Sequence, residues 1–286
     1  MAGVSTKDIK NRIRSMESTK QITKAMEMVA ASKLRQAQNR ITASRPYFEI
    51  LSNTISDIVA TNQDFTSPYL RRQTGNRVLF VVIAGDRGLA GGYNNNIFKM
   101  FDQAAAGLDD VCVVPVGKKA QDFMRRRPKA RVLTDRFALV DGTTTADADE
   151  IAKTLCQSFL KGEIRSVTVI YTNFASMLSQ VPCTLKVLPI EASTIQEERK
   201  GATALTMYEP DGETVFNAVI PAFVSGVFYG AVCESLASEV AARRTAMDAA
   251  SKNASAMIEE LNLRYNRARQ GAITQEITEI VAGSEA

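Results

Sequence analysis

Histidine and tryptophan are both absent from the 286-residue sequence. Without an imidazole the chain has no His-dependent catalytic triad, His metal ligand or imidazole proton relay, so these chemistries are excluded. Its cysteines stand far apart, in no CxxC or other metal-ligand spacing, which is typical of a reducing compartment where thiols stay free. We expect them to be small buried hydrophobes, and we expect no metal and no cofactor. The four are Cys112, Cys156, Cys183 and Cys233.

Long apolar runs are also missing. The longest nearly uninterrupted one covers residues 78–84, far short of the roughly 20 residues that span a bilayer. The N-terminus has no apolar core of the signal-peptide kind. Hydrophobic residues nevertheless make up 45 % of the chain, which is enough for a real core. We therefore expect a soluble, folded chain whose association with any membrane is indirect.

Positive charge is concentrated at one end of the chain. Residues 1–45 hold ten basic and three acidic side chains, so this segment favours an acidic protein partner or a polyanion such as nucleic acid. Arg125, Arg126 and Arg127 form a second basic cluster. Interleaved aromatic residues for base stacking are missing. A solvated or protein-facing surface is the simpler interpretation, and a coiled-coil nucleic-acid adaptor is the alternative.

The first segment, residues 1–60, reads as one helix. It has no glycine after Gly3, and its only proline is Pro46. Apolar side chains recur at helical spacing, with a small change of phase. They are Ile9, Ile13, Met16, Ile22, Met26, Val29, Ala30, Leu34, Ala37 and Ile41.

The second segment, residues 75–205, alternates strand and helix signals and predicts a Rossmann-like α/β domain. We expect strands at 77–84, 111–116, 130–140, 166–174 and 183–190, with helices at 95–106, 118–127 and 146–161. Strands that are apolar on both faces indicate a mostly parallel sheet covered on both sides. The acids Asp147, Asp149 and Glu150 lie at a predicted helix start, where they complement the helix dipole.

The third segment, residues 212–286, gives no strand signal. Residues 214–281 as a single helix would extend about 100 Å, whereas a compact domain of this chain length has a radius of gyration of about 19 Å. Such a helix protrudes, and it needs a partner along its length. We expect the N-terminal helix to pair with it as a long antiparallel coiled coil, with the α/β domain inserted between the two arms.

The C-terminal arm is slim at its centre, where alanines recur from Ala241 to Ala256, and apolar at its end. Ile273, Ile277, Ile280 and Val281 form a stripe that is expected to outrun the shorter N-terminal arm. Bare apolar surface at the tip of a rod indicates a sleeve supplied by another protein.

A glycine-rich turn, GDRGLAGG at residues 85–92, stands between a strand and a helix, where phosphate-binding loops also occur. No Gly-Lys-Ser/Thr follows, the spacing is not GxGxxG, and the next strand does not end in an acid that could hold a ribose. A structural turn with an exposed Arg87 is the simpler interpretation. A nucleotide-binding α/β enzyme with helical oligomerisation arms is the alternative.

Several stretches together resemble the gamma subunit of rotary F-type ATP synthases, over nearly the whole chain. They are KQITKAMEMVAASKLRQAQ (20–38), GDRGLAGGYNNNIFK (85–99), NFASMLSQVP (173–182), SLASEVAARRTAMDAAS (235–251) and YNRARQGAITQEITEIVAG (265–283). The resemblance implies a non-catalytic central stalk that turns inside a ring of alpha and beta subunits and couples ion flow to ATP synthesis. It also implies docking of the foot onto the epsilon subunit and the membrane c-ring, and no nucleic-acid partner.

The resemblance further implies particular contact residues. Acidic lever loops of the beta subunits would meet the chain near Lys24, Met26, Arg243, Arg269, Gln270 and Thr274. The tip residues Ile273, Ile277 and Ile280 would turn in an apolar bearing. Tyr208 and Glu209 would lie at the foot near the rotor ring.

Two features depart from the family pattern. The family often ends one or two apolar residues later, and nothing here resembles the regulatory cysteine loop of chloroplast members, so thiol control of rotation is not expected. Because no transit peptide precedes the first helix, we expect a bacterial origin and a peripheral position on the cytoplasmic face of the plasma membrane.

Overall fold

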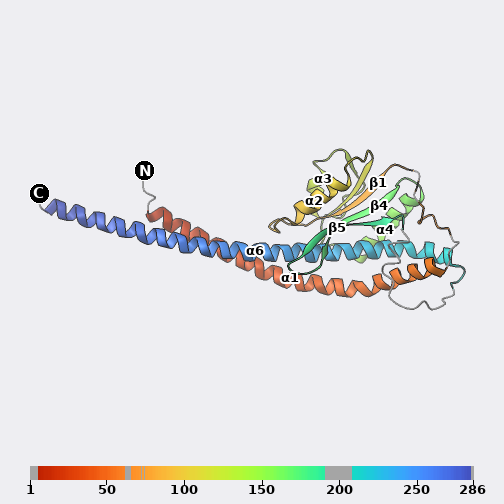
Figure 1. Cartoon of the computed structure of the whole chain (residues 1–286), viewed down its shortest axis with the longest axis horizontal. Helices are drawn as coiled ribbons and strands as arrows, with labels where there is room; N and C mark the ends of the chain where they lie inside the picture. Colours follow the sequence, from red (N-terminus) through yellow and green to blue (C-terminus); the bar gives the residue numbers. More distant parts are fainter. Residues whose placement is uncertain (1–5, 62–65, 72, 74, 191–207, 285–286) are drawn as a thin grey trace. The chain divides into compact units, whose positions relative to one another are not determined.

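The computed structural model of the chain describes residues 6–61, 66–71, 73, 75–190 and 208–284. The part of the predicted α/β segment at 191–205 lies outside these residues. The chain forms two compact units, Met1–Ser32 with Arg243–Ala286, and Lys33–Ala242. The long helices α1 (Thr6–Thr61) and α6 (Gly212–Ser284) each contribute to both units (Figure 1). The domain division predicted from the sequence, at residues 1–60, 75–205 and 212–286, stays a prediction.

The unit Lys33–Ala242 contains a five-stranded sheet in the order β3-β2-β1-β4-β5. Its strands are β1 (Val78–Ile83), β2 (Val111–Val116), β3 (Ala130–Val132), β4 (Ser166–Phe174) and β5 (Gln180–Leu188). Parallel pairing joins β1 to β2 and β4, and β2 to β3, while β5 returns antiparallel to β4. The prediction of a mostly parallel sheet is confirmed.

Helices cover both faces of this sheet. Alternate residues of a strand point to opposite faces, so Phe80 and Val82 join a core with Ile97 of α2 (Tyr93–Ala104) and Met124 of α3 (Lys118–Met124). Leu79, Val81 and Ile83 are fully buried on the other face, the side on which α4 (Thr145–Leu160) and α6 lie (Figure 1). Burial on both faces explains why β1 and β2 read as unbroken apolar runs.

The helix α4 starts as the acids at its N-terminus suggested. Thr144 and Asp147 form a capping box, in which the Asp147 amide donates to the Thr144 hydroxyl and the Asp147 carboxylate accepts from the Thr144 amide at 2.8 Å. Hydrogen bonds from the Thr144 side chain and then its backbone hold the pKa of Asp147 below its ordinary value. Asp149, two residues further on, accepts a hydrogen bond from Ser225 of α6 at 2.5 Å. Asp147 therefore caps α4, and Asp149 links α4 to α6.

The third predicted strand is the clearest correction. We expected residues 130–140, but β3 pairs with β2 over three residues only. Beyond it the chain turns away, because the amide of Gly117 bonds the Phe137 carbonyl and the amide of Val140 bonds the Asp86 carboxylate. These hydrogen bonds compete with strand pairing. The last strand is also shifted, from the expected 183–190 to Gln180–Leu188.

The two long helices continue through their prolines, Pro46 in α1 and Pro221 in α6. The helix α6 also contains an 18-residue window with a mean hydropathy of 1.7, apolar enough to cross a membrane by length and composition, although half of it is buried in the protein. Phe216, Val224 and Phe228 of α6 are buried in the core of their unit. Burial of this kind gives a core helix the same composition as a membrane span.

In the other unit, the first part of α1 runs antiparallel to the last part of α6 (Figure 1). The buried hydroxyls of Thr23 and Ser251 lie 2.7 Å apart and share a hydrogen bond between the two helices. Small residues are buried on both sides of this pair, among them Ala30 and Ala254. The predicted apolar stripe is wrong at two positions, since Ile22 and Val29 are 60 % and 59 % exposed. Each precedes a buried small residue, Thr23 or Ala30, by one position and is turned away from the buried face of the helix.

Candidate functional site

The arm residues named from the sequence fall into two sets along α6 and its partner. Lys24, Met26 and Arg243 belong to the first set, and Arg269, Gln270 and Thr274 to the second. The hydroxyl bond between Thr23 and Ser251 fixes the antiparallel register of the two helices. Arg269 follows Arg243 by 26 residues, a distance of about 39 Å along a helix. The structure therefore does not gather the two sets into one site but places them at separate levels of α6.

The first set lies in a field of alternating charge. The Lys24 ammonium donates to the Glu27 carboxylate at 3.0 Å on α1, and Lys252 donates to Asp248 at 2.8 Å on α6. A hydrogen bond from Lys252, and the further charges of Lys252 and Lys24, lower the pKa of Asp248. The positive charge of Lys24 is thus partly balanced within the chain. Sequence reasoning counted Lys24 as a cation for an acidic partner and Glu27 only as part of the net charge. It did not anticipate that Glu27 pairs with Lys24 or that Asp248 lies nearby.

Met26 and Arg243 are half-buried, whereas all three residues of the second set are exposed. The Thr274 hydroxyl bonds the Gln270 carbonyl within the helix at 2.9 Å, so it shields a backbone group without leaving the surface. The second set consequently presents polar side chains that are open to contact from outside.

Apolar side chains are bare at the end of α6. Ile273, Ile277 and Ile280 are 46 %, 56 % and 72 % exposed. The described part of α1 begins at Thr6, 17 residues before Thr23, and a regular antiparallel pair places this start opposite about residue 268 of α6. The apolar stripe therefore lies beyond the described part of α1, and only a partner outside these helices could bury it.

At the opposite end of α6, Tyr208 and Glu209 precede the first helical turn. Tyr208 is half-buried and Glu209 is exposed. Asp211 caps the helix, because its carboxylate accepts from the amide of Thr214 at 2.8 Å and from its hydroxyl at 2.9 Å. These bonds lower the pKa of Asp211. The two foot residues thus stand directly before a well-defined helix start.

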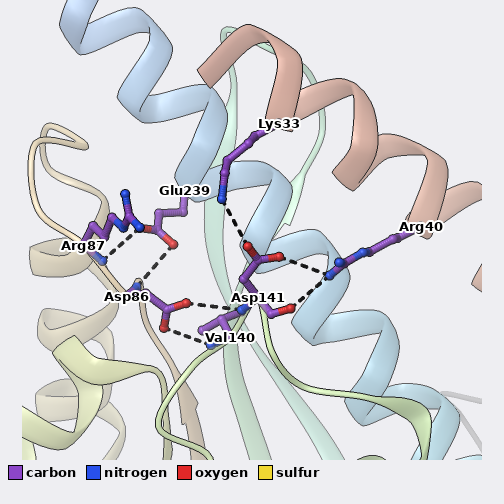
Figure 2. Close-up of polar contacts among 7 residues, drawn as sticks. All are labelled: Lys33, Arg40, Asp86, Arg87, Val140, Asp141 and Glu239. Atoms are coloured by element: carbon purple, nitrogen blue, oxygen red, sulfur yellow. Dashed lines mark hydrogen bonds and ion pairs between the residues drawn. The ribbon is translucent and has the colours of Figure 1, made fainter. Parts of the chain in front are cut away.

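The glycine-rich turn after β1 binds an anion that belongs to the chain itself. Glu239 of α6 is 3 % exposed, and its carboxylate accepts hydrogen bonds from the amides of Asp86 at 3.3 Å and Arg87 at 3.2 Å (Figure 2). Burial, and next the charge of Glu239, raise the pKa of the nearby Tyr93. Backbone amides at such a turn are the groups that would otherwise hold a phosphate. In this chain they hold a carboxylate of α6.

Sequence reasoning missed Glu239, although one signal was available. It is the single acid between Ala237 and Ala242, in the small-residue stretch ASEVAA. A charged residue on a stripe of small buried residues needs a fixed partner. In the structure, that partner is the glycine-rich turn at residues 85–92.

Comparison with known proteins gives a consistent result over the whole length. The ATP synthase family matches residues 5–286. The chain is 43 % identical to the ATP synthase gamma chain of Ruminococcus albus over 283 residues, 97 % of each chain, and 42 % identical to that of Heliobacterium modesticaldum over 285 residues, 98 % of each. In fold it is similar to a chain of the Euglena gracilis mitochondrial ATP synthase, with a TM-score of 0.64 and 19 % identity over 98 % of this chain and 93 % of that one.

Proposed function

The chain belongs to the family of ATP synthase gamma chains, and from this premise we propose that it is the central rotating shaft of a bacterial F-type ATP synthase. It transmits torque between a membrane rotor ring and a ring of three alpha and three beta subunits. By turning, it forces the catalytic sites through different affinities in sequence. Ion flow is thereby coupled to ATP synthesis.

The observation that carries this proposal is the continuous helix α6. Its 73 residues correspond to about 110 Å of regular helix, with a capped start beside Tyr208 and Glu209 and a bare apolar end. A helix of this length can carry torque only if other groups hold it along its sides. The antiparallel partner α1 supplies one support, and the exposed isoleucines indicate that another protein supplies the second.

The contact residues keep the roles that the resemblance implies, as proposals. Acidic lever loops of the beta subunits contact the polar residues of the arms, and an apolar sleeve of the alpha and beta subunits surrounds the tip. The foot meets the epsilon subunit and the c-ring. The arm contacts are Lys24, Met26, Arg243, Arg269, Gln270 and Thr274; the tip contacts are Ile273, Ile277 and Ile280; the foot contacts are Tyr208 and Glu209.

We propose that this subunit has no active site of its own. The turn that could bind a phosphate already binds the Glu239 carboxylate, and a second anion there would meet electrostatic repulsion from a buried charge. The catalytic sites then belong to the beta subunits. The complex lies on the cytoplasmic face of the plasma membrane, and this chain reaches the membrane only through its partners.

Reconstitution tests the proposal. Alpha, beta and epsilon subunits are assembled with and without this chain on vesicles that carry the membrane sector, and ATP hydrolysis and acidification or sodium uptake are measured together. We expect ion uptake driven by ATP only when the chain is present. Uptake without the chain, or hydrolysis without uptake in its presence, would contradict the shaft function.

A further inference from the structure

A series of three carboxylates connects the two long helices through the loops of the α/β domain (Figure 2). We call this series, Glu239, Asp86 and Asp141, the carboxylate bridge. All of its groups lie in the unit Lys33–Ala242. Each carboxylate accepts hydrogen bonds from an element other than its own, so the bridge links α6, the turn after β1, the loop before α4, and α1.

The first link is buried. The Glu239 carboxylate reaches out of α6 to the amides of Asp86 and Arg87. A Cβ added at Gly85 would lie 2.7 Å from the carboxyl carbon of Glu239 and 2.8 Å from its Oε1, closer than real Cβ contacts occur. A side chain at position 85 would therefore displace the α6 carboxylate, because that carboxylate packs directly against the backbone of Gly85. This close contact accounts for Gly85 of the glycine-rich motif without any bound ligand.

The second link passes from the turn to the loop before α4. Asp86 accepts hydrogen bonds from the amides of Val140 at 2.9 Å and Asp141 at 3.2 Å. These are the same bonds that draw the chain away from β3. Two neighbouring amides on one carboxylate fix the loop in position and orientation.

The third link returns to α1. The Asp141 carboxylate accepts from Lys33 at 3.2 Å and Arg40 at 3.3 Å, and the Asp141 carbonyl also accepts from Arg40 at 3.2 Å. Lys33 and Arg40 stand two turns apart on one side of α1. Asp141 thus holds α1 at two levels, although each of these ion pairs is half-exposed and weaker than the buried link.

The bridge supplies something that the apolar contacts of these helices do not. A single contact between small apolar side chains has little directional preference, whereas a hydrogen bond to a fixed amide defines both position and angle. Glu239 and Lys33 also stand in the last turns of α6 and α1 that belong to this unit, since it begins at Lys33 and ends at Ala242.

We propose that the carboxylate bridge fixes both helices in rotation to the α/β domain, so that the domain and the shaft turn together, with Glu239 as its principal positioning residue. The proposal rests on the shaft function and goes beyond it by assigning the step between domain and helix to particular groups. Without the bridge, α1 loses its charged link to the domain, while α6 keeps its hydrogen bonds to α2, α4 and β4. Both helices then twist further against the domain under load, and part of each rotation is lost.

The test uses the complete complex on sealed vesicles. Glu239→Gln keeps the size of the side chain but replaces one acceptor oxygen by a donor that faces an amide. Asp141→Ala removes the exposed link. The matched control is Asp102→Asn, which breaks the ion pair with Arg127 at 2.7 Å between α2 and the turn after α3, inside the same domain but away from both long helices.

Two readouts separate local structure from coupling. Hydrogen exchange at the amides of Asp86 and Arg87 should rise by about tenfold or more in Glu239→Gln, as expected when a charge-assisted hydrogen bond is lost. The ratio of ions pumped to ATP hydrolysed should fall in Glu239→Gln, fall less in Asp141→Ala, and stay at the wild-type value in Asp102→Asn.

A disulfide offers a rescue that a merely structural role would not predict. Gly85→Cys with Glu239→Cys replaces the buried link by a covalent bond that a reductant opens. We expect the oxidised double variant to pump at the wild-type ratio and the reduced one to pump poorly, even if Glu239→Gln fails to assemble. If wild type pumps and all bridge variants, oxidised or reduced, keep the wild-type ratio of ions pumped to ATP hydrolysed, the bridge proposal is wrong while the shaft function stands. If wild type hydrolyses ATP without pumping, the shaft function itself fails.

Discussion

Glu234 of α6 provides a sharp test of how buried charge is balanced along this helix. It stands five residues before Glu239, yet its surroundings differ. One side of its carboxylate accepts a hydrogen bond from the Phe174 backbone, while Oε2 is buried with no hydrogen-bond partner among the described residues. Burial is the main cause that raises the pKa of Glu234 above its ordinary value of 4.5. At neutral pH the ionised form therefore destabilises the folded unit.

The perturbation is Glu234→Gln, which removes the charge and keeps the shape. An unpartnered buried polar group costs about 1–3 kcal/mol. Because Glu234 lines an open cavity of about 660 Å³ between α1 and α6, solvent screens part of that cost, and we expect a gain of about 1 kcal/mol. The sign depends on pH. A carboxyl whose pKa is raised by folding contributes full stability below pH 4.5 and loses it as pH rises through the folded pKa.

The assay is hydrogen exchange of the β1 amides, Val78–Ile83, which are fully buried and report on opening of the whole unit. At pH 8 we expect these amides to exchange about fivefold more slowly in Glu234→Gln than in wild type at the same pH. The difference should shrink as pH is lowered toward 4.5. The matched control, Glu239→Gln, should exchange faster than wild type at pH 8, since its carboxylate has amide partners. A loss of stability in Glu234→Gln at pH 8, or a gain that does not change with pH, would refute the reasoning.

Two further predictions concern other buried groups. Thr23→Val or Ser251→Ala alone should destabilise the paired helices by about 1 kcal/mol, because one hydroxyl is left without its partner. The double variant should be close to wild type in stability. Hydrogen exchange of the neighbouring helix amides measures these changes, and single effects that simply add in the double variant would contradict the prediction. Burial raises the pKa of the Cys156 thiol to about 12. Iodoacetamide at pH 8 should therefore modify the half-exposed Cys183 first and leave Cys156 unmodified. The stability that the protonated Cys156 contributes should be lost as pH rises from about 9 through 12. Rapid modification of Cys156 in the folded chain at pH 8 would show that the thiol is not buried as described.

Much of the fold could be predicted from the sequence because its signals are local. The apolar runs of β1 and β2 and the long stretch without strand residues at 212–286 depend on periodicity and on the absence of breakers. β3 could not be predicted correctly, since residues 133–140 have a strand-like composition. The Val140 amide donates to Asp86 and the Phe137 carbonyl accepts from Gly117, and both of these partners are distant in sequence. A pattern within eight residues contains no information about that competition.

The candidate site was predicted less completely, for a related reason. The arm and tip residues were identified through resemblance, and their contacts with other subunits stay predictions. The stripe on α1 was misplaced at Ile22 and Val29, because the buried face of the helix passes through Thr23 and Ala30, one position further along in each case. The carboxylate bridge joins residues up to 153 positions apart, and neither a charge nor a glycine alone indicates such a link.

The central claim is tested most directly by watching the chain turn. Alpha and beta subunits assembled with it are fixed to a surface, and a bead is attached through Lys129→Cys, an exposed turn residue before β3, with Cys183 replaced by serine. With ATP present, we predict continuous rotation in one direction with pauses at three equally spaced angles, because three catalytic sites act in turn. Random angular motion of the bead, in particles that hydrolyse ATP, would contradict the account.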